Sequence, residues 1–461
     1  MKIRDFIGKK VFMIGIGGSS MSGLARLLKW KGCVVSGSDR TATHKTQALE
    51  SENIKIYIGH KGENVSGSDF VIYSAAISAE NPERCFAFEH GIPQIERCTL
   101  IGLLMEDYEN PIAVSGTHGK TTTTAMLSQV FMDVGEDPTV HIGGEFDFLG
   151  GSTRLGSGNS FICEACEFNA SFLSFLPRQA IILNIDEDHL DFYKDIDDIE
   201  NTFLKFANLV PEDGAVFGSG DDKRVWRLLK KLKCKTCTFG LEPQNEIRAE
   251  NITYDENGCA CFTATYFGHP LMEVELTVPG EHIVKDALAV LAAANYNELP
   301  MSRVSEALHE FGGVHRRYEL TSITDGVRIY TDYGHNPAET RAVLSVARKQ
   351  AHQKLWAVLQ PHTYTRTKTL FNGFLECFDD ADEVLVTEIC AAREKDPGDI
   401  NSSMLVDAML KKGIHAHLTP TFDDAEQFLR AHWNKGDSCI TLGCGDIYLL
   451  NEQIAEHGDT Q

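Results

Sequence analysis

A segment in the first third of the chain constrains the fold more strongly than any other. The apolar run Pro111 to Val114 has the length of a buried parallel strand, and residues 115–124 read Ser-Gly-Thr-His-Gly-Lys-Thr-Thr-Thr-Thr. Apolar residues then recur at helical spacing over 125–131. A strand, a glycine-containing turn and a helix in this order predict a phosphate-binding loop in a parallel sheet.

The residue types in this loop suit a bound triphosphate. Glycines at 116 and 119 allow backbone N–H groups to turn toward an anion, and the start of the next helix adds partial positive charge. Lys120 would neutralise the outer phosphates, and the hydroxyl of Thr121 would bind Mg²⁺. Val114 replaces the first glycine of the common motif, so a simple capped helix is the alternative. The flanking strand and helix favour nucleotide binding.

Acidic residues follow two predicted strands in the same part of the chain. Glu164 ends a strand-like run, and a buried-strand sequence at 180–185 leads into Asp186-Glu187-Asp188-His189-Leu190-Asp191. Placing four carboxylates and a histidine close together is electrostatically unfavourable unless a cation or solvent offsets the repulsion. An exposed acidic loop is the alternative. Because Mg²⁺ takes carboxylate and phosphate oxygens, the position after a buried strand favours a magnesium site.

The beginning of the chain predicts another α/β unit. A strand at 10–14 leads into Gly15-Ile16-Gly17-Gly18-Ser19-Ser20, a helical segment follows, and a second strand ends at Asp39. This is the order of a Rossmann-like βαβ unit, with an acidic residue about 20 residues after the glycines. Ser20 replaces the third glycine of the dinucleotide fingerprint. The turn is therefore expected either to hold a diphosphate of some kind or only to pack the helix against the strand.

Predicted strands also alternate with helical segments in the last third of the chain. Polar, glycine or proline residues follow each strand, at 332–337, 360–367, 391–398 and 443–446. The earlier strand 70–77 ends in small residues that include Ser74. Since α/β sheets bind ligands at the carboxyl ends of their strands, we expect these segments to face substrates.

Composition narrows the class of protein. A chain of 461 residues suggests three domains at about 150 residues each. The net charge of −23 argues against a nucleic-acid or membrane-surface binder, and the first residues lack an apolar signal region, so we expect a cytoplasmic protein with neither partner. Thirteen cysteines include the close pairs Cys163/Cys166 and Cys234/Cys237. We interpret them as reduced thiols, because Cys163 lies in a strand-like run, Cys234 follows a lysine-rich helix and the count is odd.

Taken in order, these motifs resemble those of the Mur ligases, ATP-dependent enzymes that form amide bonds in bacterial cell-wall synthesis. The segments that carry the resemblance are 15–19, 116–121, 184–191, 332–335, 360–367 and 392–394. The resemblance implies an α/β protein of three domains: an N-terminal Rossmann-like domain (1–109) for the UDP portion of the substrate, a central P-loop ATPase-like domain with a parallel sheet (110–318) for ATP and Mg²⁺, and a C-terminal Rossmann-like domain (319–461) that closes over ATP and the amino acid.

The resemblance also implies roles for individual residues. The UDP-sugar would be bound by Gly15, Gly17, Gly18, Ser19, Ser20, Asp39 and Ser74. ATP would be bound by Gly116, Thr117, His118, Gly119, Lys120, Thr121, Thr122, His282, Asp286, Arg317 and Asp332, and Mg²⁺ by Thr121, Glu164 and His189. The acyl phosphate and the incoming amino acid would meet His335, His362, Arg366 and Arg393, and the catalytic set would be Lys120, Glu164, His189, His335 and Arg366. Ile283 and Asp286 stand where the family commonly has asparagines, which affects the adenine contacts.

Within the family, the motifs resemble members that join L-alanine to the lactyl carboxylate of UDP-N-acetylmuramate through an acyl phosphate made from ATP. Such an enzyme is expected to be a monomer or a weak homodimer, and the sequence leaves open whether serine or glycine can replace alanine. One alternative is the recycling ligase that adds a preformed tripeptide to the same sugar nucleotide. Two others are an NAD(P)-dependent dehydrogenase that uses the first βαβ unit and a non-catalytic binder of cell-wall nucleotides.

Overall fold

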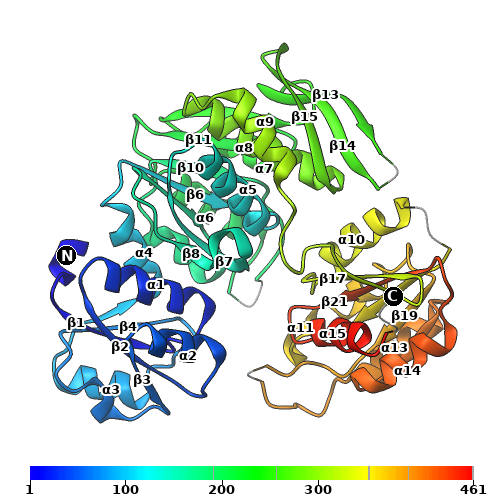
Figure 1. Ribbon diagram of the computed structural model, residues 1–461, viewed down its shortest axis with the longest axis horizontal. Coiled ribbons are helices and arrows are strands. Elements are labelled where there is room, and N and C mark those ends of the chain that lie inside the picture. The colour runs from blue at the N-terminus through cyan, green and yellow to red at the C-terminus, as the bar shows by residue number, and fades with distance from the viewer. Residues whose placement is uncertain (190–191, 256, 351–352, 393, 459–461) are drawn as a thin grey trace. The chain divides into compact units, whose positions relative to one another are not determined.

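The computed structural model of the protein describes residues 1–189, 192–255, 257–350, 353–392 and 394–458. Its strands form three sheets, one in each successive part of the chain (Figure 1). The chain divides into two compact units, and the first contains Met1–Thr253, Cys261–Thr277 and Glu281–Gly312. The second unit contains Tyr254–Ala260, Val278–Gly280 and Gly313–Gln461. The α/β fold class predicted from the sequence is confirmed.

The N-terminal sheet is entirely parallel, with strand order β3-β2-β1-β4-β5. Its strands are β1 (Lys10–Ile14), β2 (Val34–Asp39), β3 (Lys55–Ile58), β4 (Phe70–Tyr73) and β5 (Gln94–Glu96), and its helices are α1 (Ser19–Trp30), α2 (His44–Ser51), α3 (Pro82–Glu89) and α4 (Arg97–Met105). Val11 and Met13 belong to one buried cluster, whereas Phe12 and Ile14 belong to another. Because successive side chains of a strand point to opposite faces, both faces of this sheet are covered, as a parallel sheet requires.

The central sheet has ten strands in the order β15-β14-β13-β12-β11-β10-β6-β9-β7-β8. Its strands are β6 (Asn110–Ser115), β7 (Thr139–Phe146), β8 (Gly151–Arg154), β9 (Ser160–Glu164), β10 (Gln179–Ile182), β11 (Ala215–Ser219), β12 (Lys235–Gly240), β13 (Ile247–Tyr254), β14 (Cys259–Tyr266) and β15 (His269–Pro279). Its helices are α5 (Lys120–Asp133), α6 (Ile196–Ala207), α7 (Lys223–Leu229), α8 (Glu281–Tyr296) and α9 (Met301–Glu310).

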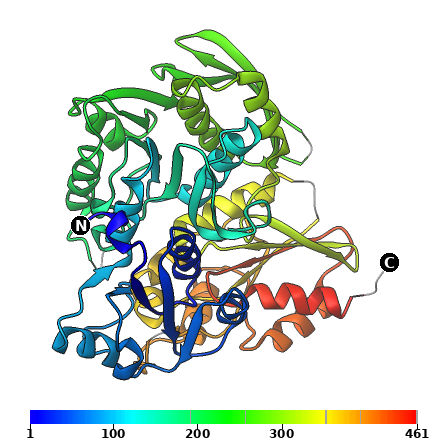
Figure 2. The same cartoon turned by 60° about the vertical axis from the view of Figure 1, so that its left-hand side comes forward.

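The middle of this sheet positions the candidate site. β6 lies between β9 and β10 and is parallel to both, so the residues after these three strands meet at one edge. β8 runs antiparallel to β7, and β13 to β15 extend the opposite end of the sheet (Figure 2). The sheet is therefore parallel in its centre and carries additions at its two ends that the sequence analysis did not foresee.

The C-terminal sheet has the order β16-β17-β21-β18-β19-β20, and only β16 is antiparallel to its neighbour. Its strands are β16 (Glu319–Thr324), β17 (Val327–Asp332), β18 (Leu355–Leu359), β19 (Glu383–Val386), β20 (Ala416–Leu418) and β21 (Ser438–Leu442). Its helices are α10 (Pro337–Lys349), α11 (Tyr364–Thr369), α12 (Phe371–Phe374), α13 (Ser402–Lys411), α14 (Phe422–His432) and α15 (Tyr448–Glu456). Ala357 and Trp356 on β18 belong to different buried clusters, so helices cover both faces here too.

Among the described residues, no helix has both the length and the apolar character needed to cross a membrane.

Candidate active site

The predicted phosphate loop connects β6 to α5, and two of its glycines have backbone angles that other residues rarely adopt. Gly116 has φ 147° and Gly119 has φ 83°. A Cβ atom at 119 would lie 2.9 Å from Oδ1 of Asp286, and one at 116 would lie 2.9 Å from Cβ of Leu183. Glycine is thus required at both positions for the conformation and for the space.

Asn184, two residues after the end of β10, holds the loop in place. Its Oδ1 accepts a hydrogen bond from the N–H of His118 at 2.8 Å, and its Nδ2 donates to the carbonyl of His118 at 3.1 Å. The backbone N–H of Thr117 donates to the carbonyl of Asn184, and the Thr117 hydroxyl accepts from the N–H of Asp186. The sequence analysis gave Asn184 no role, although its place at the end of a buried strand was a usable signal.

Lys120 is the first residue of α5, and its ammonium is surrounded by acceptors from the protein itself. Nζ donates to the carbonyls of Gly116 at 2.6 Å and Thr117 at 2.9 Å, and to Oε1 of Glu167 at 3.0 Å. Burial alone would lower the pKa of Lys120, but the adjacent Glu167 carboxylate, helped by Glu164, outweighs burial and raises it. Lys120 therefore carries a full positive charge inside the loop.

Two of the predicted metal ligands are hydrogen-bonded to each other. The hydroxyl of Thr121 donates to Oε2 of Glu164 at 3.0 Å, and the same oxygen accepts the backbone N–H of Gly143 at 3.0 Å. The side chain of Glu164 leaves the end of β9 next to the start of α5. A hydroxyl and a carboxylate oxygen are the hard ligands that Mg²⁺ prefers, so this pair fits the predicted ion.

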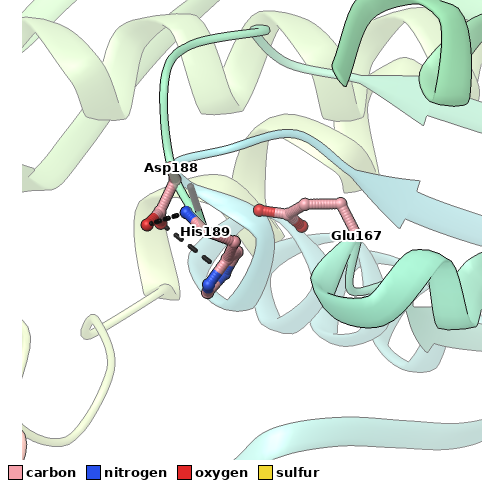
Figure 3. Close-up of side chains that lie close together, drawn as sticks. All are labelled: Glu167, Asp188 and His189. Carbon is pink, nitrogen blue, oxygen red and sulfur yellow. Dashed lines mark hydrogen bonds and ion pairs between the residues drawn. The ribbon is translucent and has the colours of Figure 1, made fainter. Parts of the chain in front are cut away.

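The third predicted ligand, His189, lies with Asp188 of the same acidic loop and with Glu167, to which the sequence analysis gave no role. One ligand atom each of Glu167, Asp188 and His189 lie within 4.8 Å of one another (Figure 3). Nε2 of His189 is 3.6 Å from Oδ2 of Asp188, and the carboxylate of Glu167 points toward this pair. His189 has φ 53°, a left-handed conformation that sets the direction of its ring. Two carboxylates and an imidazole also fit a divalent cation.

The residues predicted to bind the rest of ATP are divided between the two units. Thr122 is buried in the first turn of α5, and His282 is exposed in the first turn of α8. Asp286 is 6% exposed and approaches Gly119, so α8 contributes a carboxylate to the edge of the phosphate loop. Arg317 and Asp332 belong to the second unit.

Five of the seven residues predicted to bind the UDP-sugar lie between β1 and the first turn of α1, and Asp39 ends the neighbouring strand β2. Gly15 has φ 76°, and the N–H of Gly17 donates to Oδ2 of Asp39 at 2.9 Å. The hydroxyl of Ser19 accepts from Nζ of Lys45 at 2.6 Å. Gly18 caps α1, Ser20 lies in its first turn, and Ser74 follows the neighbouring strand β4. The backbone N–H groups of residues 15–18 donate to acceptors of the protein itself, and the turn lies beside Lys45, a lysine that the sequence analysis had missed.

Three of the predicted amino-acid-site residues lie together in the second unit. Nη1 of Arg366 is 3.2 Å from Nδ1 of His362, and the rings of His335 and His362 have centroids 6.5 Å apart. Burial lowers the pKa of His335, which is therefore neutral at pH 7. Arg393 lies outside the described residues.

Asp332, at the end of β17, is buried and is held by backbone donors. Oδ2 accepts from the N–H of Tyr318 at 2.8 Å, and Oδ1 accepts from the N–H of Gly334 at 2.6 Å. Burial raises the pKa of Asp332 to about 6, although the positive charge of Arg317 opposes this shift. A buried carboxylate with such a pKa beside polar loop residues is typical of a functional site.

Comparisons with known proteins cover almost the whole chain. The family model "Mur ligase family, catalytic domain" matches residues 10–109, "Mur ligase middle domain" matches 114–294, and "Mur ligase, glutamate ligase domain" matches 316–445. The UDP-N-acetylmuramate--L-alanine ligase of Acetivibrio thermocellus is 45% identical over 447 residues, which are 97% of this chain and 95% of that protein. The enzyme of the same name from Clostridium botulinum (strain Okra / Type B1) is 44% identical over 97% of this chain and 98% of its own.

Solved structures give the same result. The UDP-N-acetylmuramate-alanine ligase of Thermotoga maritima superposes with a TM-score of 0.82 at 28% identity, over 97% of this chain and 98% of that one. A murein peptide ligase from Psychrobacter arcticus has a TM-score of 0.71 at 22% identity, over 97% and 98% of the two chains. The second likeness shows a shared fold only.

Proposed function

This chain belongs to the Mur ligase family, and we propose that it joins L-alanine to the lactyl carboxylate of UDP-N-acetylmuramate with the cleavage of ATP to ADP and phosphate. The reaction serves peptidoglycan precursor synthesis. The observation that carries the proposal is that relatives with this activity in their names match 97% of the chain at 44% to 45% identity. The dehydrogenase, the tripeptide-adding ligase and the non-catalytic binder are not favoured, because none accounts for that match together with the charged phosphate loop.

The chemistry requires activation of the lactyl carboxylate, which has no good leaving group of its own. Transfer of the γ-phosphoryl group of ATP to a carboxylate oxygen gives an acyl phosphate and ADP. The neutral amine of L-alanine then attacks the acyl carbon, and the resulting tetrahedral intermediate expels phosphate as the amide forms. The protein positions the reactants and stabilises the developing negative charge, and none of its side chains needs to act as a covalent nucleophile.

Lys120 and its loop would bind the β- and γ-phosphates of ATP. The carbonyls and the Glu167 carboxylate that now accept from Nζ mark acceptor positions that phosphate oxygens would take over. The ammonium would then stabilise the negative charge of the transferred phosphoryl group. Mg²⁺ would be held by Thr121 with Glu164, and by His189 with its two acidic neighbours. When bound, it neutralises phosphate charge and polarises the γ-phosphoryl group.

The polar cluster of the second unit would bind the acyl phosphate and the amino acid. Arg366 supplies a positive charge for a phosphate or carboxylate oxygen, and it is hydrogen-bonded to His362. His335 is neutral at pH 7 and can accept a proton from the amine. Closure around the ligands would exclude water, which would otherwise hydrolyse the acyl phosphate.

The domain limits 1–109, 110–318 and 319–461 remain part of this proposal, supported by the placement of one sheet mainly within each range. A cytoplasmic location fits substrates that include ATP and a nucleotide-activated sugar. We propose that the enzyme acts as a monomer or a weak homodimer.

A phosphate-release assay tests the function. Purified protein with ATP, Mg²⁺ and UDP-N-acetylmuramate is given L-alanine, L-serine, glycine or a cell-wall tripeptide, one at a time. We expect release to be fastest with L-alanine and to fall at least about 100-fold in Lys120→Ala, because charge stabilisation of this kind contributes that much. Faster release with the tripeptide, or near-normal release by Lys120→Ala, would overturn the proposal.

A further inference from the structure

A chain of partly buried hydrogen bonds connects the glycine turn after β1 to the central sheet. The hydroxyl of Ser20, in the first turn of α1, is 2.9 Å from Nη1 of Arg97 and 2.8 Å from Nε2 of His141 on β7. Nδ1 of His141 is in turn 2.8 Å from the hydroxyl of Thr153 on β8. None of the motifs found in the sequence includes Arg97, His141 or Thr153.

The chemistry of these groups limits the directions of the hydrogen bonds. Arg97 can only donate, so Ser20 Oγ accepts from it. The neutral ring of His141 donates through one nitrogen and accepts through the other, and the hydroxyls of Ser20 and Thr153 can take the complementary role in either case. His141 is 3% exposed, and burial, together with the charge of Arg97, lowers its pKa to about 3. The ring is therefore neutral under physiological conditions, and both of its nitrogens have a hydroxyl partner.

The helix α1 is closely packed against this part of the central sheet. α1 packs against β7 and β8 (Figure 1). A Cβ atom at Gly23 would lie 1.9 Å from the hydroxyl oxygen of Thr153. The hydroxyl of Ser152 also donates to the carbonyl of Ser19 at 2.8 Å. The start of α1, which follows the glycine turn, is thus attached to the central sheet at several points.

The same strand also reaches the candidate metal site. Gly143, two residues after His141 on β7, donates its N–H to Oε2 of Glu164. A Cβ atom at the next residue, Gly144, would lie 3.2 Å from Cγ2 of Thr121. One short segment of β7 therefore contacts the glycine turn through His141 and the Thr121–Glu164 pair through its backbone.

We propose that His141 is a positioning residue that fixes Ser20 and Arg97 beside the glycine turn and couples sugar-nucleotide binding there to the geometry of Glu164 at the metal site. This inference rests on the proposed function, because it assigns the glycine turn to UDP-N-acetylmuramate. A bound diphosphate would draw on the Ser20 hydroxyl or the Arg97 charge, and any shift of Ser20 would be transmitted to β7 through the ring of His141. Binding of the sugar nucleotide and of ATP with Mg²⁺ would then favour each other.

The test measures binding by isothermal titration calorimetry in the full-length protein. The Kd of UDP-N-acetylmuramate is determined with and without a non-hydrolysable ATP analogue and Mg²⁺, in the wild type and in His141→Leu, Ser20→Ala and the double variant. We expect His141→Leu to raise this Kd about tenfold and to remove most of the tightening caused by the analogue. The double variant should be no weaker than the weaker single variant, because both substitutions break the same chain.

Two further variants separate positioning from a general loss of stability. Thr153→Val removes only the hydroxyl that is hydrogen-bonded to Nδ1 of His141, and it should also raise the Kd, by a smaller factor. Thr139→Val is the matched control: Thr139 is also buried on β7 and hydrogen-bonded, but to Tyr108 and Gly156. Its binding and its coupling should equal those of the wild type.

The outcomes distinguish the two proposals. If the wild type does not bind UDP-N-acetylmuramate, the proposed function fails and this inference fails with it. If the wild type binds but His141→Leu and Thr153→Val retain its Kd and its coupling, or if the effects of Ser20→Ala and His141→Leu add, the inference alone is overturned. If His141→Leu is too unstable to measure, the Kd and the coupling of Thr153→Val decide whether the inference holds.

Discussion

At the scale of single residues, the ammonium of Lys120 has protein partners that a bound nucleotide must replace. Glu167 is 2% exposed, so its ion pair with Lys120 lies in a poorly hydrated environment. Glu167 also belongs to the cluster with Asp188 and His189. One carboxylate therefore neutralises the lysine and is available to a cation, and removing its charge should affect both stability and metal dependence.

The substitution Glu167→Gln tests this double role. We expect the free energy of unfolding to fall by about 1–3 kcal/mol, because a buried charge loses its ionic partner while the amide still offers one acceptor. We also expect the Mg²⁺ concentration for half-maximal phosphate release to rise. Urea unfolding and a Mg²⁺ titration measure the two effects.

Glu212→Gln is the matched control, because Glu212 pairs with Lys233 at 4.0 Å and is 79% exposed in its side chain. It should change the stability by less than about 0.5 kcal/mol. A Glu167→Gln variant that behaves like this control would contradict the role assigned to Glu167.

The raised pKa of Asp332 leads us to expect that the reaction slows at acidic pH. Its pKa is raised to about 6, so the folded protein binds this proton more tightly than the unfolded chain does. Protonation of Asp332 therefore stabilises the folded protein increasingly as the pH falls through about 6. Over the same range, Asp332 loses the negative charge that interacts with Arg317. We expect kcat/KM for ATP to decrease below a pH of about 6 in the wild type but not in Asp332→Asn. If Asp332→Asn shows the same decrease, the titration of another group causes it.

At the scale of secondary-structure elements, the turn between β6 and α5 depends on glycine. Gly119→Ala places a Cβ at φ 83° and 2.9 Å from Oδ1 of Asp286. Gly135 follows the same helix with φ 95°, but a Cβ there would have nothing within 4 Å. Gly135→Ala thus isolates the conformational cost, about 1 kcal/mol, from the additional contact.

We expect Gly119→Ala to weaken binding of a fluorescent ATP analogue by at least about tenfold, since the loop must shift away from the phosphate position. Gly135→Ala should bind it as the wild type does. Equal affinities of the two variants would show that the contact with Asp286 is relieved without moving the loop.

The sequence predicted well those elements that contact the segments next to them in the chain. β6, its loop and α5 could be predicted because a buried strand, turn glycines and helical spacing follow one another. Glu167 could not be placed, because its partner Lys120 lies 47 positions away in the sequence. The contact between Ser20 and His141, which lie 121 positions apart, depends on how α1 packs across β7, and no local pattern encodes that.

At the scale of the whole molecule, the candidate residues are distributed over two compact units. The glycine turn, the phosphate loop and the candidate metal ligands belong to the first, whereas Asp332, His335 and Arg366 belong to the second. Catalysis as proposed requires residues of both units to contact the same ligands. Neither unit alone carries the complete set.

Hydrogen exchange can detect that requirement. With UDP-N-acetylmuramate, a non-hydrolysable ATP analogue and Mg²⁺ together, we expect slower exchange of the backbone N–H groups at 332–336 in the second unit. The helix α13, which holds none of the candidate residues, should exchange at its original rate and serves as the internal control. Unchanged exchange at 332–336 under saturating ligands would mean that this segment does not meet them.

The central claim is that ATP activates the lactyl carboxylate before L-alanine attacks it, and oxygen transfer reports this step directly. UDP-N-acetylmuramate labelled with ¹⁸O in both carboxylate oxygens is turned over with ATP, Mg²⁺ and L-alanine, and the released phosphate is examined by mass spectrometry. We predict that each phosphate carries one ¹⁸O atom and that the amide product retains the other. Unlabelled phosphate, or phosphate release without the alanyl product, would contradict the account.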